Sequence, residues 1–221
     1  MNCRVFFLAA SLSLAFFPSM ADDWPGFGGA RRDGASTEKG LRLEWGDDEP
    51  KPLWKAKVGA GYSSVIEAAG LAYTVGNANG KNTIFCFDAN SGEKKWTHSF
   101  PCEKAPKYFD GGSRATPAVA DGILYLASHE GAFFAFEAKT GKRHWQKRMG
   151  KGHSAAPVTA GGLVYVVSDA GVTRIVRPGP QFELVAENAT GERCYASPAI
   201  SHGQIFIRGE KNLFCIGKNP K

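Results

Sequence analysis

Short runs of alternating apolar and polar residues follow one another along most of this chain, separated by glycine-containing turns, and the order of the runs repeats. The clearest copies span residues 61–96 and 113–145. Each copy begins with small residues, continues through several apolar or alternating runs, and ends in a run that carries Trp96 or Trp145. Period-two alternation is typical of strands with one buried face, and a regular period of this kind indicates a repeat architecture.

Four repeats can be aligned on the residue that begins the first strand of each. These anchor residues are Val65, Pro117, Pro157 and Pro198. A glycine lies five residues after each anchor, at Gly70, Gly122, Gly162 and Gly203. Glycine there supplies the positive φ that a two-residue hairpin turn requires. The repeats predict four antiparallel units, each one blade of a β-propeller, over residues 62–100, 114–149, 154–187 and 195–217.

The fourth repeat supplies only three strands, and we expect the missing strand to come from the N-terminal side. Residues 53–58 have the pattern of a fourth strand and precede the first repeat. Pairing with residues 212–217 would close the ring and cover edge strands. The expected fold class is all-β, a small β-propeller of about four four-stranded antiparallel blades whose last blade is closed by an N-terminal strand.

A ring that closes on itself in this way predicts a monomer. The alternatives are an incomplete ring that is a shortened form of a longer propeller, and a ring that is completed by oligomerisation.

The first 21 residues have the features of a cleavable signal peptide. Arg4 precedes an apolar run over residues 5–17, and small residues at Ser19 and Ala21 fit cleavage after Ala21. The run is shorter than the roughly 20 apolar residues of a spanning helix. We therefore expect a periplasmic or secreted protein with no transmembrane segment, and the alternative is an uncleaved anchor.

The remaining chain divides into two parts. Residues 22–52 are rich in Gly, Asp and Arg, and we expect an extended segment packed on the ring by Trp24, Phe27 and Trp45. Residues 53–218 are predicted to form the propeller.

The charge of the chain is mildly basic. Removing residues 1–21 leaves 26 basic and 21 acidic residues, which is a net charge of about +5. The basic residues are spread over strand ends and turns, which is typical of a solvated surface, so we expect no nucleic-acid binding. Binding to another polyanion is the alternative.

The cysteines left after processing show no C-x-x-C spacing, so we expect no metal site. Cys86 and Cys215 occupy equivalent strand positions and are expected to act as small buried apolar residues. Cys102 and Cys194 fall in connections between strands. Export would permit a disulfide between them, and the sequence leaves that question open.

Two segments resemble a known repeat. CFDANSGEKKW (residues 86–96) and AFEAKTGKRHW (residues 135–145) are similar to the A-x-D-x-x-T-G-x-x-x-W repeat of quinoprotein-like propellers. That family includes alcohol dehydrogenases that use pyrroloquinoline quinone (PQQ) and non-enzymatic relatives, among them the propeller subunit of the outer-membrane barrel assembly machinery. Residues 24–36 and 194–217 resemble exported bacterial PQQ-like repeat proteins. The resemblance covers nearly all of the mature chain.

The resemblance implies structural roles for five residues that would dock one blade on the next. They are Trp54, Gly92, Trp96, Gly141 and Trp145. It also implies what a dehydrogenase of this family would need, which is a vicinal Cys-Cys disulfide against the quinone and a calcium site beside it. The chain has no Cys-Cys pair. We therefore expect no catalytic residues and no PQQ or other cofactor.

Repeat symmetry suggests one ligand site. Equivalent positions near the start of the innermost strands should surround one mouth of the central channel. The polar and aromatic residues at these positions are Tyr62, Arg114, His153 and Tyr195. Such a combination is typical of a binding site. The alternative is that these side chains plug the channel through hydrogen bonds among themselves.

The expected function is an exported, non-catalytic scaffold that binds an unknown protein or small ligand. The alternatives are a partial or degenerate PQQ-dependent dehydrogenase and a glycan or small-ligand binding protein.

Overall fold

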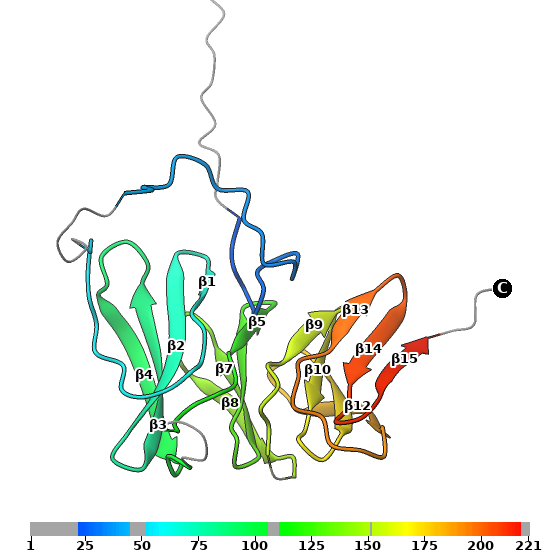
Figure 1. Ribbon diagram of the computed structural model, residues 1–221. Helices are drawn as coiled ribbons and strands as arrows, with labels where there is room; N and C mark the ends of the chain where they lie inside the picture. The colour runs from blue at the N-terminus through cyan, green and yellow to red at the C-terminus, as the bar shows by residue number, and fades with distance from the viewer. Residues whose placement is uncertain (1–21, 45–51, 106–110, 151, 218–221) are drawn as a thin grey trace, which may run out of the picture.

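The computed structural model describes residues 22–44, 52–105, 111–150 and 152–217. Its regular elements within these ranges are fifteen strands, β1 to β15 (Figure 1). The predicted signal peptide and Trp45 lie outside the described residues.

The strands form four separate antiparallel sheets, which we call blades 1 to 4. Blade 1 contains β1 (Ile66–Ala68), β2 (Leu71–Ala78), β3 (Lys81–Asp88) and β4 (Lys94–Pro101). Blade 2 contains β5 (Ala118–Ala120), β6 (Ile123–Ala127), β7 (Ala132–Glu137) and β8 (Arg143–Arg148). Blade 3 contains β9 (Val158–Ala160), β10 (Leu163–Val167), β11 (Val172–Arg177) and β12 (Glu183–Ala189). Blade 4 contains β13 (Ala199–Ser201), β14 (Gln204–Arg208) and β15 (Leu213–Gly217).

The turn between the first two strands of each blade explains why these segments pair locally. In blade 2 the two central residues, Asp121 and Gly122, have φ values of 50° and 72°. Two positive φ values in a two-residue loop are the requirement of a type I′ hairpin turn. His202 and Gly203 repeat this geometry in blade 4, with φ values of 50° and 75°. The all-β blade architecture predicted from the repeats is confirmed.

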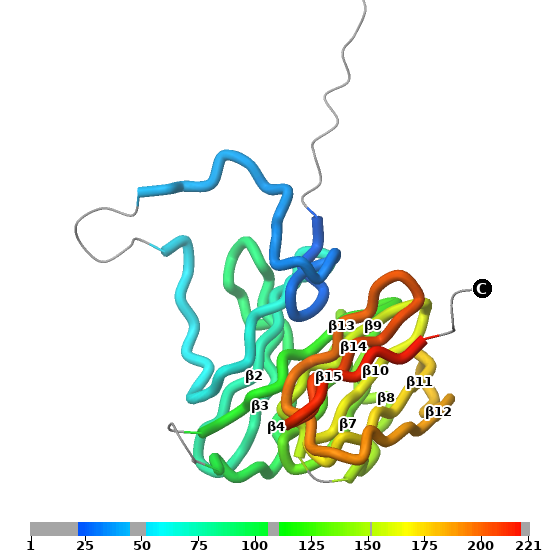
Figure 2. The backbone as a smooth tube through the Cα atoms, turned by 45° about the vertical axis from the view of Figure 1, so that its right-hand side comes forward, coloured from blue at the N-terminus to red at the C-terminus, as the bar shows by residue number. Residues whose placement is uncertain are grey.

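The blades follow one another in chain order along an arc (Figures 1 and 2). The hydrophobic core lies between their faces rather than within any one sheet. Strand β7 shows why its sequence is continuously apolar: Phe134 and Phe136 pack in the core toward blade 1, and Phe133 packs with Val164 and Val166 of blade 3. All three phenylalanines are fully buried. Burial on both faces removes the alternation that a half-exposed strand would show.

The expected closure of the ring is not formed. Among the described residues, strand β15 pairs only with β14, and blade 4 has three strands. Residues 53–58 form no strand and lie along blade 1, where the carbonyl group of Val58 packs directly against Gly76. The adjoining Ala60 exchanges two backbone hydrogen bonds of 2.9 and 2.6 Å with Asn77.

The prediction of closure was wrong because the alternating pattern of residues 53–58 is satisfied by blade 1 alone. Trp54, Ala56 and Val58 are half-buried there, while the residues between them are exposed. Blade 4 lies at the opposite end of the arc (Figure 1), and its last strand keeps Leu213 67% exposed.

An N-terminal segment, residues 22–36, crosses the first strands of three blades. Trp24 exchanges backbone hydrogen bonds of 2.8 and 3.0 Å with Glu67 on β1. The carbonyl oxygen of Pro25 accepts a hydrogen bond of 2.7 Å from the backbone N–H of Val119 on β5. The guanidinium group of Arg32 donates one of 2.5 Å to the hydroxyl of Thr159 on β9. Hydrogen bonds therefore attach this segment to the centre of the arc. Phe27, which was expected to pack the segment on the ring, is 54% exposed.

Candidate functional site

The segments that lead into the blades contact one another at their backbones. The N–H of Tyr62 donates a hydrogen bond of 2.7 Å to the carbonyl oxygen of Ser113, which joins the segments before blades 1 and 2. The N–H of Ala156 donates one of 2.9 Å to the hydroxyl of Ser197, which joins the segments before blades 3 and 4. Residues that precede equivalent strands are thus brought side by side in pairs.

The four predicted channel-mouth residues differ sharply in exposure. Tyr62 is 53% exposed and Tyr195 is 46% exposed, and the hydroxyl of Tyr195 accepts a 3.3 Å hydrogen bond from Arg193. Arg114 is half-buried and donates a 2.9 Å hydrogen bond to the carbonyl oxygen of Ala105. His153 is fully buried. The two tyrosines therefore form accessible surface, while the histidine lies inside the protein.

His153 sits in an environment that favours its neutral form. Neither of its ring nitrogens makes a hydrogen bond of regular geometry among the described residues, although the Ser128 backbone lies close enough to favour the charged form. Burial lowers the pKa of His153; Asp169 opposes this effect and Arg174 adds to it. The backbone on both sides of His153 is held by Asp169, which donates its N–H to the carbonyl of Gly152 at 2.8 Å and accepts the N–H of Ser154 at 2.7 Å.

The three tryptophans expected to dock blades share one contact. Each indole N–H donates a hydrogen bond to a backbone carbonyl oxygen in the turn before the fourth strand of a blade. The donor and acceptor residues are Trp54 and Ala89 at 3.0 Å, Trp96 and Ala138 at 2.8 Å, and Trp145 and Gly179 at 3.1 Å. A Cβ added at Gly92 or Gly141 would lie 2.5 Å from the ring of Trp54 or Trp96. These contacts pack each indole ring against a neighbouring turn, which is a structural role.

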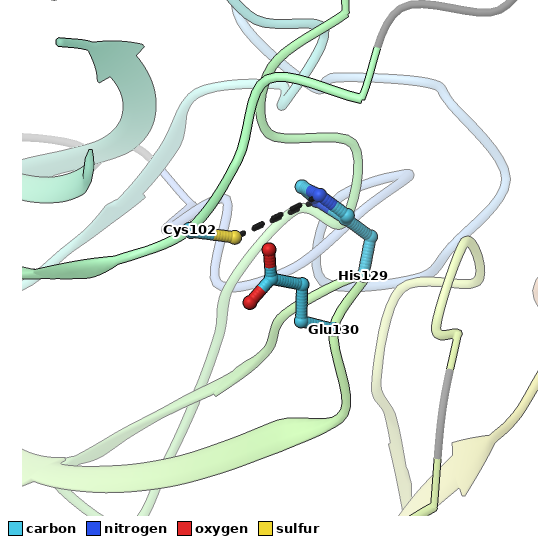
Figure 3. Close-up of side chains that lie close together, drawn as sticks. All are labelled: Cys102, His129 and Glu130. Carbon is cyan, nitrogen blue, oxygen red and sulfur yellow. Dashed lines mark hydrogen bonds between the residues drawn. The ribbon is translucent and has the colours of Figure 1, made fainter. Parts of the chain in front are cut away.

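One cluster of potential metal ligands joins blades 1 and 2. The thiol sulfur of Cys102 lies 3.8 Å from Nδ1 and 3.7 Å from Nε2 of His129 (Figure 3). The ligand atoms of Cys102, His129 and Glu130 all lie within 4.8 Å of one another. Cys102 follows β4 of blade 1, and His129 and Glu130 belong to the β6–β7 turn of blade 2.

Two buried asparagines position Cys102. The amide nitrogen of Asn82 donates a hydrogen bond of 3.3 Å to the thiol sulfur. The amide nitrogen of Asn77 lies 2.8 Å from both the carbonyl oxygen of Cys102 and the side-chain oxygen of Asn82. Burial, reinforced by the charges of Glu130 and Glu103, raises the pKa of Cys102 to about 12. Without a bound cation this thiol is therefore protonated at neutral pH.

The described cysteines are all free, so Cys102 and Cys194 form no disulfide. Cys86 is fully buried, as expected for its strand position. Cys215 is exposed, contrary to the expectation of burial, because no further blade covers that face of blade 4.

The sequence carries no spacing motif that points to the Cys102 cluster. Cys102 and His129 are 27 positions apart and occupy different positions in their repeats. Only the stacking of neighbouring blades brings the end of β4 beside the β6–β7 turn. Stacking the predicted blades in order, with the fourth strand of one against the next, would have placed Cys102 near His129.

A cavity of about 870 Å³ lies between blades 1 and 2 beside the N-terminal segment. Tyr73, Leu71 and Val119 supply apolar lining. Its charged lining residues are Asp23, Asp88, Asp121, Lys95 and Lys139. None of the four predicted channel-mouth residues lines this cavity. Among the described residues, no helix has the length and apolar character needed to cross a membrane.

Part of the chain matches a known protein family. Residues 80–179 match the family model described as outer membrane protein assembly factor BamB. Tetrathionate hydrolase from Acidithiobacillus ferrooxidans is 28% identical over 176 residues, which cover 70% of this chain and 34% of that protein. The chain therefore spans about a third of the length of this curated relative.

Two solved structures share the fold. Quinohemoprotein alcohol dehydrogenase ADHIIG from Pseudomonas putida HK5 superposes with a TM-score of 0.51 at 15% identity, over 70% of this chain and 29% of that chain. The computationally designed Ika4 protein superposes with a TM-score of 0.53 at 12% identity, over 73% of this chain and 96% of that chain. At these identities the similarity concerns the fold alone.

The region matched by the family model runs from the β2–β3 turn to the turn after β11, and it contains both tryptophan-bearing motif segments, residues 86–96 and 135–145. The family match, the stacked blades and the docking tryptophans agree with one another. Within residues 80–179, the chain is therefore similar to the PQQ-like repeat family of the outer membrane protein assembly factor BamB.

Proposed function

We propose that this protein is an exported, non-catalytic scaffold that binds a partner protein through the segments leading into its blades. The observation that carries the proposal is the exposure of large side chains on backbone that is itself firmly held. Tyr62 and Val65 are 53% and 58% exposed, and Tyr195 is 46% exposed. Tyrosine is enriched in protein interfaces, and a rigid aromatic side chain loses little entropy on binding.

The family match supports this proposal. The matching family is described as an outer membrane protein assembly factor, a role that involves other proteins. A propeller fold by itself hosts many functions, so the fold does not decide between binding and catalysis.

The residues present do not fit PQQ as the family resemblance implies it would be held. The sequence contains no adjacent pair of cysteines, and all described cysteines are free. Trp24 and Pro25 of the N-terminal segment also occupy the centre of the arc, where they bond to β1 and β5.

Site-specific crosslinking in the producing cell tests the proposal. A photoreactive phenylalanine analogue would replace Tyr62 or Tyr195, and a matched control would replace Leu184 on β12, which is 44% exposed. We expect a discrete crosslinked protein from positions 62 and 195 and none from position 184. Equal crosslinking at all three positions, or none at any, would contradict a partner site on the lead-in segments.

The cavity between blades 1 and 2 favours a second candidate function, the binding of a small polar ligand such as a glycan. Its volume of about 870 Å³ falls in the range of ligand pockets, and its lining combines apolar and charged side chains. Saturation-transfer NMR with a panel of oligosaccharides would test it. Asp121→Asn and Lys139→Ala should remove the transfer signal, whereas Lys147→Ala on β8, outside this cavity, should retain it.

A further inference from the structure

We infer that Cys102, His129 and Glu130 form a zinc site that clamps blade 1 to blade 2. This site goes beyond the proposed scaffold function, and the spacing of cysteines in the sequence did not predict it. The argument begins with the three ligand atoms, which already lie within 4.8 Å of one another without a metal between them (Figure 3).

The sulfur-to-nitrogen distance is close to what zinc requires. Zinc–sulfur bonds are about 2.3 Å and zinc–nitrogen bonds about 2.0–2.1 Å, so tetrahedral geometry places the two ligand atoms roughly 3.5 Å apart. The Cys102 sulfur lies 3.7 Å from Nε2 of His129. Because the sulfur is almost equidistant from Nδ1 and Nε2, the imidazole ring has to turn so that one nitrogen lone pair points at the metal.

Glu130 is already oriented by a hydrogen bond. Its Oε1 accepts the backbone N–H of Glu103 at 2.8 Å, which leaves Oε2 to coordinate a metal. Hydrogen bonding of a carboxylate ligand from the surrounding protein is a regular feature of metal sites. Asn82 plays the corresponding part for the sulfur, because its amide donates to the atom that would bind the metal.

The chemistry of the three donors selects the metal. Thiolate and imidazole ligands suit zinc, whereas calcium and magnesium prefer oxygen ligands throughout. Three protein ligands leave the fourth coordination position of zinc for a water molecule. Solvent can reach this position beside Glu130, which is the least buried of the three residues.

The charges around the cluster are mixed but favour a cation. Glu130 and Glu103 both act on Cys102. Arg114, Glu130 and Asp169 also lie close enough to His129 to act on it electrostatically. Three carboxylates therefore face one guanidinium group. The attraction of the three carboxylates for a divalent cation offsets part of the repulsion between that cation and the guanidinium group of Arg114.

The position of the ligands predicts what zinc does. The three residues come together only when blades 1 and 2 are stacked, so a metal that binds them stabilises the stacked state over the unfolded chain. At a zinc concentration a hundredfold above the dissociation constant, we expect Tm to rise by roughly 5–10 °C for a chain of this size.

The test uses the full mature chain carrying Cys215→Ser, which removes the exposed thiol as a competing ligand. After chelation and dialysis under reducing conditions, the protein would be titrated with Zn²⁺ while Tm is followed, and with Co²⁺ while the cobalt–thiolate absorption band is followed. We expect one metal per chain, a raised Tm, and a cobalt–thiolate band. Cys102→Ser, His129→Gln and Glu130→Gln should each weaken zinc binding at least tenfold.

His202→Asn serves as the matched control, because it removes an exposed histidine from the β13–β14 turn and should leave zinc affinity unchanged. If Cys102→Ser fails to fold, Glu130→Gln and the cobalt spectrum of the parent protein still decide the question. An unchanged Tm, a cobalt spectrum without thiolate character, or full affinity in Glu130→Gln and His129→Gln would overturn the zinc site.

Discussion

The indole nitrogen of Trp96, on the last strand of blade 1, donates a hydrogen bond of 2.8 Å to the carbonyl oxygen of Ala138 in blade 2. The same carbonyl accepts a 3.1 Å hydrogen bond from the hydroxyl of Tyr73, which also belongs to blade 1. Two side chains of one blade thus converge on a single backbone group of the next. This contact joins sheets that share no ladder hydrogen bonds.

Trp96→Phe is expected to destabilise the protein by about 1–2 kcal/mol, since it removes one hydrogen bond and part of a buried ring. The loss stays small because Tyr73 still satisfies the Ala138 carbonyl. Trp96→Ala should cost about 3–5 kcal/mol through the cavity it leaves. Urea unfolding measures both, with Phe27→Leu at an exposed position as the control. A Trp96→Phe protein as stable as its parent would argue against this docking contact.

Gly141→Ala should be more harmful than Gly122→Ala, although the two glycines have φ values of 71° and 72°. Both substitutions carry the backbone strain of a left-handed residue, about 1–2 kcal/mol. At Gly141 the new Cβ would also meet the Trp96 ring at 2.5 Å, whereas nothing lies within 4 Å at Gly122. We expect an additional loss of about 1–3 kcal/mol at Gly141. Equal losses of unfolding free energy in the two variants would rule out the proposed packing difference.

The stability of the protein should fall as the pH drops below about 6.5, the ordinary pKa of histidine, because burial lowers the pKa of His153 in the folded protein. In this range the unfolded chain binds a proton at His153 that the folded protein does not, so acid favours unfolding. His98, whose pKa is also lowered by burial, contributes in the same direction. The slope is at most about 1.4 kcal/mol per pH unit for each histidine.

His153→Leu should flatten part of this pH dependence, and His202→Asn in an exposed turn should not. Thermal unfolding between pH 5 and pH 8 measures the slope. An identical slope in the parent protein and in His153→Leu would mean that His153 is not kept neutral by the fold.

Gly29→Ala should release the N-terminal segment from the blades. Gly29 has a φ of 79°, and a Cβ there would lie 2.6 Å from the ring of Trp24. Displacing Trp24 weakens its backbone pairing with Glu67 on β1. Limited trypsin digestion should then cut faster after Arg31 and Arg32 while the blades stay intact. Gly34→Ala, with a φ of 71° and open space around the Cβ, provides the control; similar cleavage of both variants would contradict a specific role for the Trp24 contact.

Much of the fold could be predicted from the sequence because the strands of a blade pair with their neighbours in the chain. The alternation within β4, the apolar run of β7 and the positive φ at Gly122 are local properties, and each led to a correct strand or turn. The resemblance to the quinoprotein-like repeat implied a docking role for Trp96, and the structure places its ring against Gly141.

The arrangement of the blades relative to one another could not be predicted in the same way. Neighbouring blades are joined by side-chain packing without a shared ladder, so the angle between them depends on many contacts that no local pattern encodes. For this reason the pattern of residues 53–58 was compatible with pairing to β15 as well as with packing on blade 1, and the structure shows the second.

The sequence by itself determined the strands, the turns and the repeat, because those depend on residues close together in the chain. Only the tertiary structure decided that the four blades form an open arc, that His153 is enclosed while Tyr62 faces solvent, and that Cys102 meets His129. That last contact joins two blades at non-equivalent positions of the repeat, so it arises from the packing of one sheet against the next and leaves no periodic signal in the sequence.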